Sequence, residues 1–190
     1  MKVLIGIPCL LTGGTEIQTL SLVKALVSGG HEVSVACYFE HSPEMAERYR
    51  AAGADVRLLS PTGRRPGGVW SQVKFLWKGL RNVVKEVRPD VAHVQYMAPG
   101  AIPILILKTL GVKKIVATAH TSGDIYSKNG LKIIRFLTRH VLHSFQCITE
   151  NAENSFFGSS QLFSPNLKLK KHGNHFTIYN SLPDYIKIKG

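Results

Sequence analysis

Cysteine is scarce in this sequence, and its spacing excludes two kinds of cross-linked structure. Cys9, Cys37 and Cys147 are odd in number and far apart, and no two of them form a C-x-x-C pair. The sequence therefore indicates neither a disulfide framework nor a zinc site. Free thiols favour a reducing compartment, so we expect a cytoplasmic protein.

Long hydrophobic runs are also missing. No stretch reaches the ~18 consecutive apolar residues that a membrane-spanning helix needs, which excludes such a helix on length. The apolar opening could imitate a signal peptide, but Pro8 interrupts it and Gly13 and Gly14 follow. A buried first strand explains this opening better.

Acidic residues are few, because 12 Asp and Glu stand against 24 Lys and Arg and leave a net charge of +12. This charge predicts an anionic partner, such as a nucleotide diphosphate, an acidic membrane surface or a nucleic acid. The chain has no RNP-like aromatic phrase and no zinc-finger spacing. A basic nucleic-acid-binding module is thus an alternative that only the charge supports, and we expect no nucleic-acid partner.

Short apolar runs alternate with segments of helical period, which is typical of βαβ units around a parallel sheet. We therefore predict an α/β fold, a Rossmann-like domain of three layers with a mostly parallel sheet. The predicted strands are residues 2–7, 31–37, 55–59, 90–94, 114–119, 145–149 and 176–179, and the predicted helices are residues 15–28, 43–52, one ending near Pro89, 99–110 and 130–142.

The usual phosphate-binding signatures are absent, since neither G-K-[ST] nor G-x-G-x-x-G occurs. Gly13 and Gly14 nevertheless stand in the first βα turn, at the start of a predicted helix. Glycines there let a phosphate approach the backbone, and the helix N-terminus favours negative charge. The alternative is a tight turn that needs a positive φ. We take both glycines as candidate ligands of a donor phosphate.

Several phrases in order resemble glycosyltransferase family 4. They are Gly13-Gly14-Thr15-Glu16 with Gly30-His31-Glu32-Val33, then Arg88-Pro-Asp-Val-Ala-His93, Thr118-Ala119-His120, and Tyr179-Asn180-Ser181-Leu182-Pro183, with Ser181 where the family usually has Gly. The resemblance implies the N-terminal, acceptor-side half of a two-domain GT-B enzyme, with residues 1–180 as this domain and 181–190 as the start of an interdomain linker. The resemblance further implies that the C-terminal donor-binding domain is not part of this sequence.

The activity implied by this resemblance is transfer of a sugar, of hexosyl type, from a nucleotide-sugar to a sugar or lipid-linked acceptor in cell-surface polysaccharide synthesis. It implies retention of configuration, no metal and no cofactor other than the nucleotide-sugar substrate. The isolated domain is expected to be inactive. A UDP-sugar 2-epimerase of the same architecture is the rival enzyme class.

His120 is the candidate catalytic residue, because it follows a hydrophobic strand and should emerge at the same sheet edge as Gly13 and Gly14. The resemblance implies that it hydrogen-bonds the transferred sugar or the acceptor. An ordinary pKa near 6.5 would also let it assist departure of a phosphate. Thr121, His93 and Tyr96 are candidate acceptor-binding residues, and a packed histidine at a strand end is the alternative.

The third predicted helix combines basic and aromatic residues in a pattern that suits an anionic membrane surface. The residues are Trp70, Lys74, Trp77, Lys78, Arg81 and Lys85. We expect a cytoplasmic protein that associates peripherally with the inner face of the membrane. The alternative is a solvated helix whose tryptophans lie in the core.

Two histidine pairs, His140 with His143 and His172 with His175, are expected on solvated faces.

Overall fold

The computed structural model describes residues 1–96, 100–169 and 173–180 of the chain. Within these residues it contains a sheet of seven strands, all parallel, in the order β3-β2-β1-β4-β5-β6-β7. The strands are β1 (Lys2–Ile7), β2 (Glu32–Cys37), β3 (Asp55–Leu58), β4 (Val91–Tyr96), β5 (Lys114–Ala119), β6 (Ser144–Cys147) and β7 (His175–Thr177).

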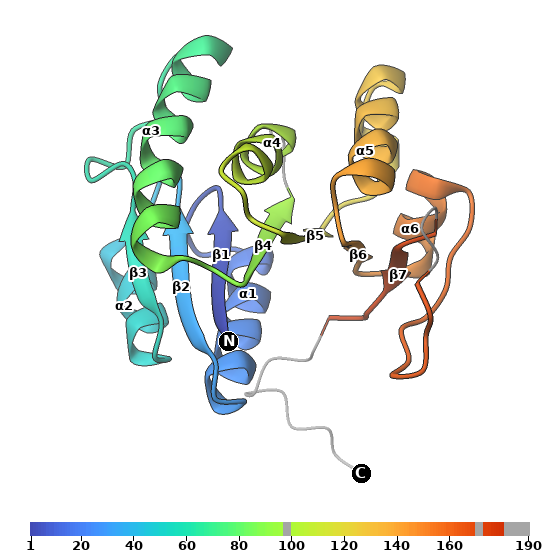
Figure 1. Ribbon diagram of the computed structural model, residues 1–190, viewed down its shortest axis with the longest axis horizontal. Coiled ribbons are helices and arrows are strands. Elements are labelled where there is room, and N and C mark those ends of the chain that lie inside the picture. The colour runs from blue at the N-terminus through green and yellow to red at the C-terminus, as the bar shows by residue number, and fades with distance from the viewer. Residues whose placement is uncertain (97–99, 170–172, 181–190) are drawn as a thin grey trace.

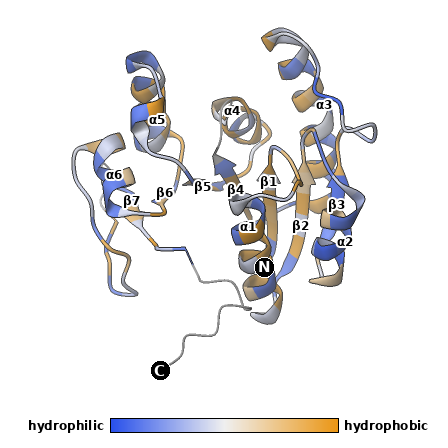
Figure 2. Cartoon of the chain, turned by 180° about the vertical axis from the view of Figure 1, so that it is seen from behind, coloured by the Kyte–Doolittle hydropathy of each residue, from blue (hydrophilic) through white to orange (hydrophobic). Residues whose placement is uncertain are grey.

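Helices cover both faces of this sheet, as Figure 1 and Figure 2 show from opposite sides. They are α1 (Gly14–Ser28), α2 (Pro43–Ala51), α3 (Val69–Val87), α4 (Ala101–Thr109), α5 (Lys128–His140) and α6 (Glu150–Phe157), with a short 3-10 helix η1 (Gly123–Ile125). The α/β class predicted from the alternation of apolar runs is confirmed.

Two hydrophobic cores lie on opposite faces of the sheet. Alternate residues of β1 separate them, because Val3 and Ile5 join the core under α1 and α2 while Leu4 joins the other. The second core lies under α3, α4, α5 and α6, and Leu80 and Phe156 within it are fully buried. The near-continuous apolar strands follow from this burial on both faces.

The strand order reverses between β1 and β4. Because β3 lies at the sheet edge and β4 returns beside β1, α3 must cross the opposite face from α1 and α2. On the face of α1 and α2, β4, β5 and β6 therefore lie beyond the apolar core of these helices. Such a switch point is where open parallel sheets bind ligands.

The structure differs from the predicted elements at two places. β4 extends to Tyr96, so His93 lies in the middle of the strand and Tyr96 ends it, whereas we had expected both to follow the strand.

Helix α6 was not predicted, since only Ala152, Phe156 and Phe157 give it an apolar side. Its start is nevertheless marked by Thr149, whose hydroxyl accepts a hydrogen bond from the Ala152 amide. The expected linker at 181–190 lies outside the described residues.

A buried polar cluster fixes β7 against α6. The carboxylate of Glu153, which is fully buried, accepts hydrogen bonds from His175 Nδ1 at 2.6 Å and Thr177 Oγ1 at 2.6 Å. The His175 ring stacks on Phe157 with centroids 4.1 Å apart. The expectation of a solvated His175 was therefore wrong, because spacing alone does not show that a carboxylate distant in sequence packs beside it. His172 lies outside the described residues.

We expect Leu80→Ala to lower the free energy of unfolding by about 2–5 kcal/mol, since this side chain is fully buried between α3 and the sheet. The matched control is Leu105→Ala, a helix position where the side chain is 47% exposed. It should change stability by less than about 0.5 kcal/mol. Urea denaturation followed by circular dichroism measures both, and equal losses would contradict the assignment of the core.

Candidate functional site

The first βα turn brings two glycines to the start of α1 at the carboxyl edge of the sheet. Gly13 is the N-cap with φ −154° and ψ 169°, and Gly14 is not among the glycines with positive φ. The alternative of a turn that needs positive φ is thus wrong. A Cβ on Gly13 would lie 2.5 Å from Glu16 Oε2, whereas one on Gly14 would meet nothing within 4 Å. The backbone of Gly14 is therefore open to a ligand.

Glu16 lies buried in the first turn of α1, next to this open backbone. Its Oε1 accepts a hydrogen bond from the thiol of Cys9 at 3.0 Å, and its backbone carbonyl accepts one from the hydroxyl of Tyr49 at 2.6 Å. Burial and then this hydrogen bond raise the pKa of Cys9 to about 12, so the thiol remains protonated. These contacts hold the N-terminus of α1 in place.

His120 follows β5 at the same edge, as the sequence predicted, and contacts a residue that the sequence analysis missed. Its Nε2 lies 2.8 Å from Oε1 of Gln95, which is almost completely buried on the neighbouring strand β4. If Nε2 donates to this oxygen, Nδ1 carries a lone pair that can accept a hydrogen bond. The Gln95 Nε2 group is buried without a hydrogen-bond partner, which leaves a donor for an oxygen of a ligand.

A second row of polar side chains lies beside this pair and crosses three strands. His93 Nε2 lies 2.6 Å from Thr118 Oγ1, and this hydroxyl donates to Gln146 Oε1 at 3.3 Å. Because the hydroxyl has one proton, His93 must be the donor to Thr118. The parallel register places Gln95, Thr118 and Gln146 side by side. His93 therefore sits on the sheet face, rather than at the strand end where we expected it.

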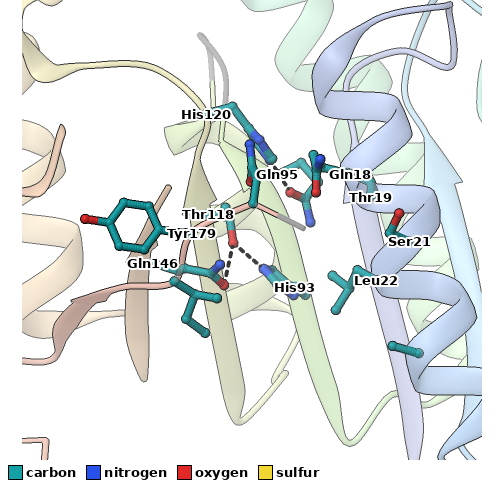
Figure 3. A pocket seen from close by; sticks show the side chains of 13 residues that line it. Gln18, Thr19, Ser21, Leu22, His93, Gln95, Thr118, His120, Gln146 and Tyr179 are labelled. Carbon is teal, nitrogen blue, oxygen red and sulfur yellow. Dashed lines mark hydrogen bonds between the residues drawn. The ribbon is translucent and has the colours of Figure 1, made fainter. Parts of the chain in front are cut away.

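These groups line a pocket of about 310 Å³ between α1 and the segment that follows β7 (Figure 3). The lining side chains come from α1, from strands β4, β5 and β6 with the residue after β5, and from residues 178–180. They are Gln18, Thr19, Ser21, Leu22, Ala25, His93, Gln95, Thr118, His120, Gln146, Ile178, Tyr179 and Asn180. None of these described residues is Lys, Arg, Asp or Glu. Amides, hydroxyls and imidazoles suit a neutral polyhydroxyl ligand such as a sugar better than an ion.

Burial keeps both histidines of the pocket neutral at pH 7. It lowers the pKa of His120 to about 4, although the nearby Glu16 carboxylate opposes this shift. It lowers the pKa of His93 to about 4 as well, and the neighbouring His120 adds to the effect. The ordinary pKa near 6.5 assumed from the sequence thus does not hold for His120, which acts as a neutral hydrogen-bonding group.

The other two expected acceptor-binding residues are Thr121 and Tyr96, of which Thr121 does not line this pocket. Thr121 follows His120, and its Oγ1 is buried without a hydrogen-bond partner. Tyr96 ends β4, one residue after Gln95. Met97, which follows it, lies outside the described residues. The structure therefore brings His93 and His120 together in the pocket and leaves Thr121 outside its lining.

The basic and aromatic residues predicted on the third helix lie together on one exposed stripe of α3, at the spacing i, i+4, i+7, i+8, i+11 and i+15. They are Trp70, Lys74, Trp77, Lys78, Arg81 and Lys85. Trp70 is 80% exposed and Trp77 is 38% exposed, so neither belongs to the core. Glu86, the carboxylate of this helix, lies off the stripe and pairs with Arg57. Within the described residues, no helix combines the length and hydropathy of a membrane span.

The seven-stranded parallel sheet and the pocket at its switch point define a Rossmann-like domain of the GT-B type. Solved structures of similar fold include a glycosyltransferase from Rickettsia africae (TM-score 0.65, 13% identity, covering 93% of this chain and 42% of that one). MurG from Acinetobacter baumannii is also similar (TM-score 0.60, 11% identity, 96% and 46%). This chain thus spans less than half the length of these proteins.

The chain belongs to glycosyltransferase family 4, whose family model matches residues 12–153. The comparison with curated protein sequences gave no match. The fold alone does not separate this family from the rival class, since the UDP-GlcNAc 2-epimerase from Neisseria meningitidis, solved with UDP-GlcNAc, has a TM-score of 0.62 at 11% identity, covering 95% of this chain and 47% of that one. The family match is what favours the glycosyltransferase.

We expect the free energy of unfolding to fall as the pH is lowered from 7 to 4.5. Between the unfolded pKa near 6.5 and the folded pKa near 4, the unfolded chain binds protons at His93 and His120 that the folded chain does not. Urea denaturation at both pH values measures this decrease. In the variant His120→Asn, the free energy of unfolding should fall less over this pH range. A decrease as large as that of the wild type would contradict the burial of a neutral His120.

Proposed function

We propose that this domain forms the acceptor side of an enzyme that transfers a hexosyl group from a nucleotide-sugar to a sugar or lipid-linked acceptor. A second α/β domain in a longer polypeptide would hold most of the donor. The observation that carries the proposal is the proximity of two features at one edge of the sheet. One is the open backbone at the start of α1, and the other is the neutral polar pocket under His120.

The start of α1 suits the diphosphate of the donor. Its first backbone N–H groups have no partner within the helix, and the helix dipole favours negative charge there. Gly14 leaves room for phosphate oxygens to approach these groups, while Gly13 accommodates Glu16. No basic side chain lines the adjoining pocket among the described residues, so backbone N–H groups are the donors that this half offers to phosphate.

His120 would contact the transferred sugar or the acceptor. Its Nε2 is held by Gln95, which leaves Nδ1 free to accept a hydrogen bond from a hydroxyl. The unpartnered Nε2 of Gln95 would donate to an oxygen of the same ligand. Thr121, His93 and Tyr96 remain candidates for contact with the acceptor, with His93 acting through Thr118 on the floor of the pocket.

The family resemblance supports two further parts of the proposal. Transfer retains the anomeric configuration, and the nucleotide-sugar serves as substrate with no metal and no separate cofactor. Analysis of the product by NMR tests both, because the anomeric coupling constant reports configuration and added chelator reports a metal requirement. The same analysis separates transfer from epimerisation, which would give a free or nucleotide-bound epimer in place of a new glycosidic bond.

The exposed stripe of α3 supports peripheral association with the inner face of a membrane from the cytoplasm. Two exposed tryptophans lie among four Lys and Arg side chains with no carboxylate on the stripe. Interfacial aromatics and cations of this kind bind anionic headgroups. A membrane-bound position would bring the enzyme to a lipid-linked acceptor of cell-surface polysaccharide synthesis.

We expect the chain to bind UDP and nucleotide-sugars weakly, with a Kd of about millimolar order, because one wall of the donor site is present. Gly14→Val should weaken this binding by about tenfold, since its side chain would occupy the open space beside the α1 amides. Gly67→Val is the matched control, because a Cβ there also meets nothing within 4 Å. NMR titration measures both, and equal affinities would remove Gly14 from the site.

In a polypeptide that also carries the donor-binding half, we expect His120→Ala to lower kcat by about 10² while the thermal midpoint stays high enough for assay. A positioned hydrogen-bonding group of this kind contributes about that factor. Steady-state assays with a nucleotide-sugar donor provide the measurement. His143→Ala, at an exposed position, is the control and should keep the wild-type kcat. A loss below threefold in His120→Ala would assign this residue a structural role only.

A further inference from the structure

The net positive charge of the chain is distributed unevenly between its two helix layers. On one face of the sheet, α1 and α2 are balanced, with Lys24, Arg48 and Arg50 against Glu16, Glu44 and Glu47. On the other face, α3, α4 and α5 carry nine Lys and Arg and one carboxylate, Glu86, which Arg57 already pairs. Helix α6 of the same layer adds Glu150 and Glu153, of which Glu153 is buried against His175. An anionic partner would therefore find a larger excess of cations on α3, α4 and α5 than on α1 and α2.

Helix α5 repeats the pattern of the α3 stripe, and the sequence analysis did not predict a role for it. Lys128, Lys132, Arg135 and Arg139 follow one line at the spacing i, i+4, i+7 and i+11, and the helix contains no acidic residue. Next to this line, Phe136 is 59% exposed and Ile133 is 51% exposed. Ile134 and Leu137 face the core on the other side. The outer face of α5 is thus both cationic and apolar.

Exposed apolar side chains gather where α3 and α5 begin, at the carboxyl edge of the sheet. Val69 is 67% and Trp70 is 80% exposed in the first turn of α3, and Ile125 just before α5 is 70% exposed. Both views show α3 and α5 rising past the ends of the strands on either side of α4 (Figures 1 and 2). The two helices form a pair of projections beside the edge that bears His120.

We propose that α5 is a second membrane-docking element, which acts with α3 to hold the carboxyl edge of the sheet toward an anionic lipid bilayer. The exposed aliphatic and aromatic side chains at the start of α3, and before and along α5, would enter the headgroup region, while the Lys and Arg side chains beside them contact lipid phosphates. The assignment of α3 rests on the function proposed above, and the assignment of α5 extends it. In this orientation the edge of the sheet that bears His120 lies close to an acceptor presented by the bilayer.

The chemistry of these surfaces favours a bilayer over an acidic macromolecule. Ile125, Ile133 and Val69 are aliphatic, and such groups gain by leaving water for a hydrocarbon boundary but offer little to a nucleic acid, which pairs with cations and aromatic rings. Two separate projections with the same combination of groups also suit an extended planar surface. A bound peptide would instead be expected to occupy a single groove.

Flotation of the purified chain with vesicles tests the proposal, using phosphatidylcholine with and without phosphatidylglycerol. We expect binding to the anionic vesicles alone, weakened by salt. Lys128→Glu with Lys132→Glu should weaken it by about tenfold or more, as should Ile133→Ser with Phe136→Ser. The matched control, Arg48→Glu with Lys113→Glu, makes the same change of charge at exposed positions away from α3, α4 and α5 and should bind as the wild type.

Each outcome decides between assignments. If both α5 variants bind like the wild type while Lys74→Glu with Lys78→Glu does not, docking belongs to α3 alone and the proposal is overturned. Equal binding to neutral vesicles overturns it too, as does a dimer in sedimentation that Phe136→Ser dissociates, because the face would then pair two copies. Circular dichroism confirms that each variant is folded. Since flotation requires no turnover, failure of the glycosyltransferase proposal leaves this result unaffected.

Discussion

The right-handed crossover from β3 to β4 is the constraint on which the rest of the structure depends. It returns the chain from the sheet edge to a place beside β1, which forces α3 onto the face opposite α1 and α2. The later helices α4, α5 and α6 pack on the same face as α3. On the face of α1 and α2, strands β4, β5 and β6 therefore carry polar side chains instead of a core. Ile5 on β1 belongs to the core under α1 and α2, whereas its neighbour His93 on β4 is polar, so the side chains change from apolar to polar at that boundary.

Most of the fold could be predicted from the sequence because each buried strand is a short apolar run between turn signals. The prediction fails where polar residues are buried and make contacts with residues distant in the sequence. β4 continues through Gln95, which is polar and yet almost completely buried, so hydropathy ends the strand too early. α6 has few apolar residues, and part of its stability comes from Glu153, whose partners on β7 are more than twenty residues away.

The position of the site at the sheet edge could be predicted from the sequence, but the contacts among its side chains could not. His120 and Gly14 follow strands, and the ends of parallel strands meet at one edge, so the sequence places both there. Gln95, Thr118 and Gln146 become neighbours only through strand order and register, which the sequence of each strand does not contain. A signal did exist, since each is a polar residue at an alternate position in an apolar strand. His93 and Gln95 share this pattern within one strand.

The pocket of this strongly basic domain has no charged side chain in its described lining, which fits the neutral ligand proposed above. Among the described residues, the pocket is lined by amides, hydroxyls and two neutral imidazoles, while Lys and Arg concentrate on α3, α4 and α5. A lysine within hydrogen-bonding distance of the imidazoles would depress their pKa further and would attract free phosphate into the pocket. With cations concentrated on this layer, long-range attraction would orient the domain on an anionic surface as proposed above. In the proposed function, selection at the pocket would then depend on hydrogen bonds to the hydroxyls of the ligand, whose geometry is set by the pocket and not by the charge outside it.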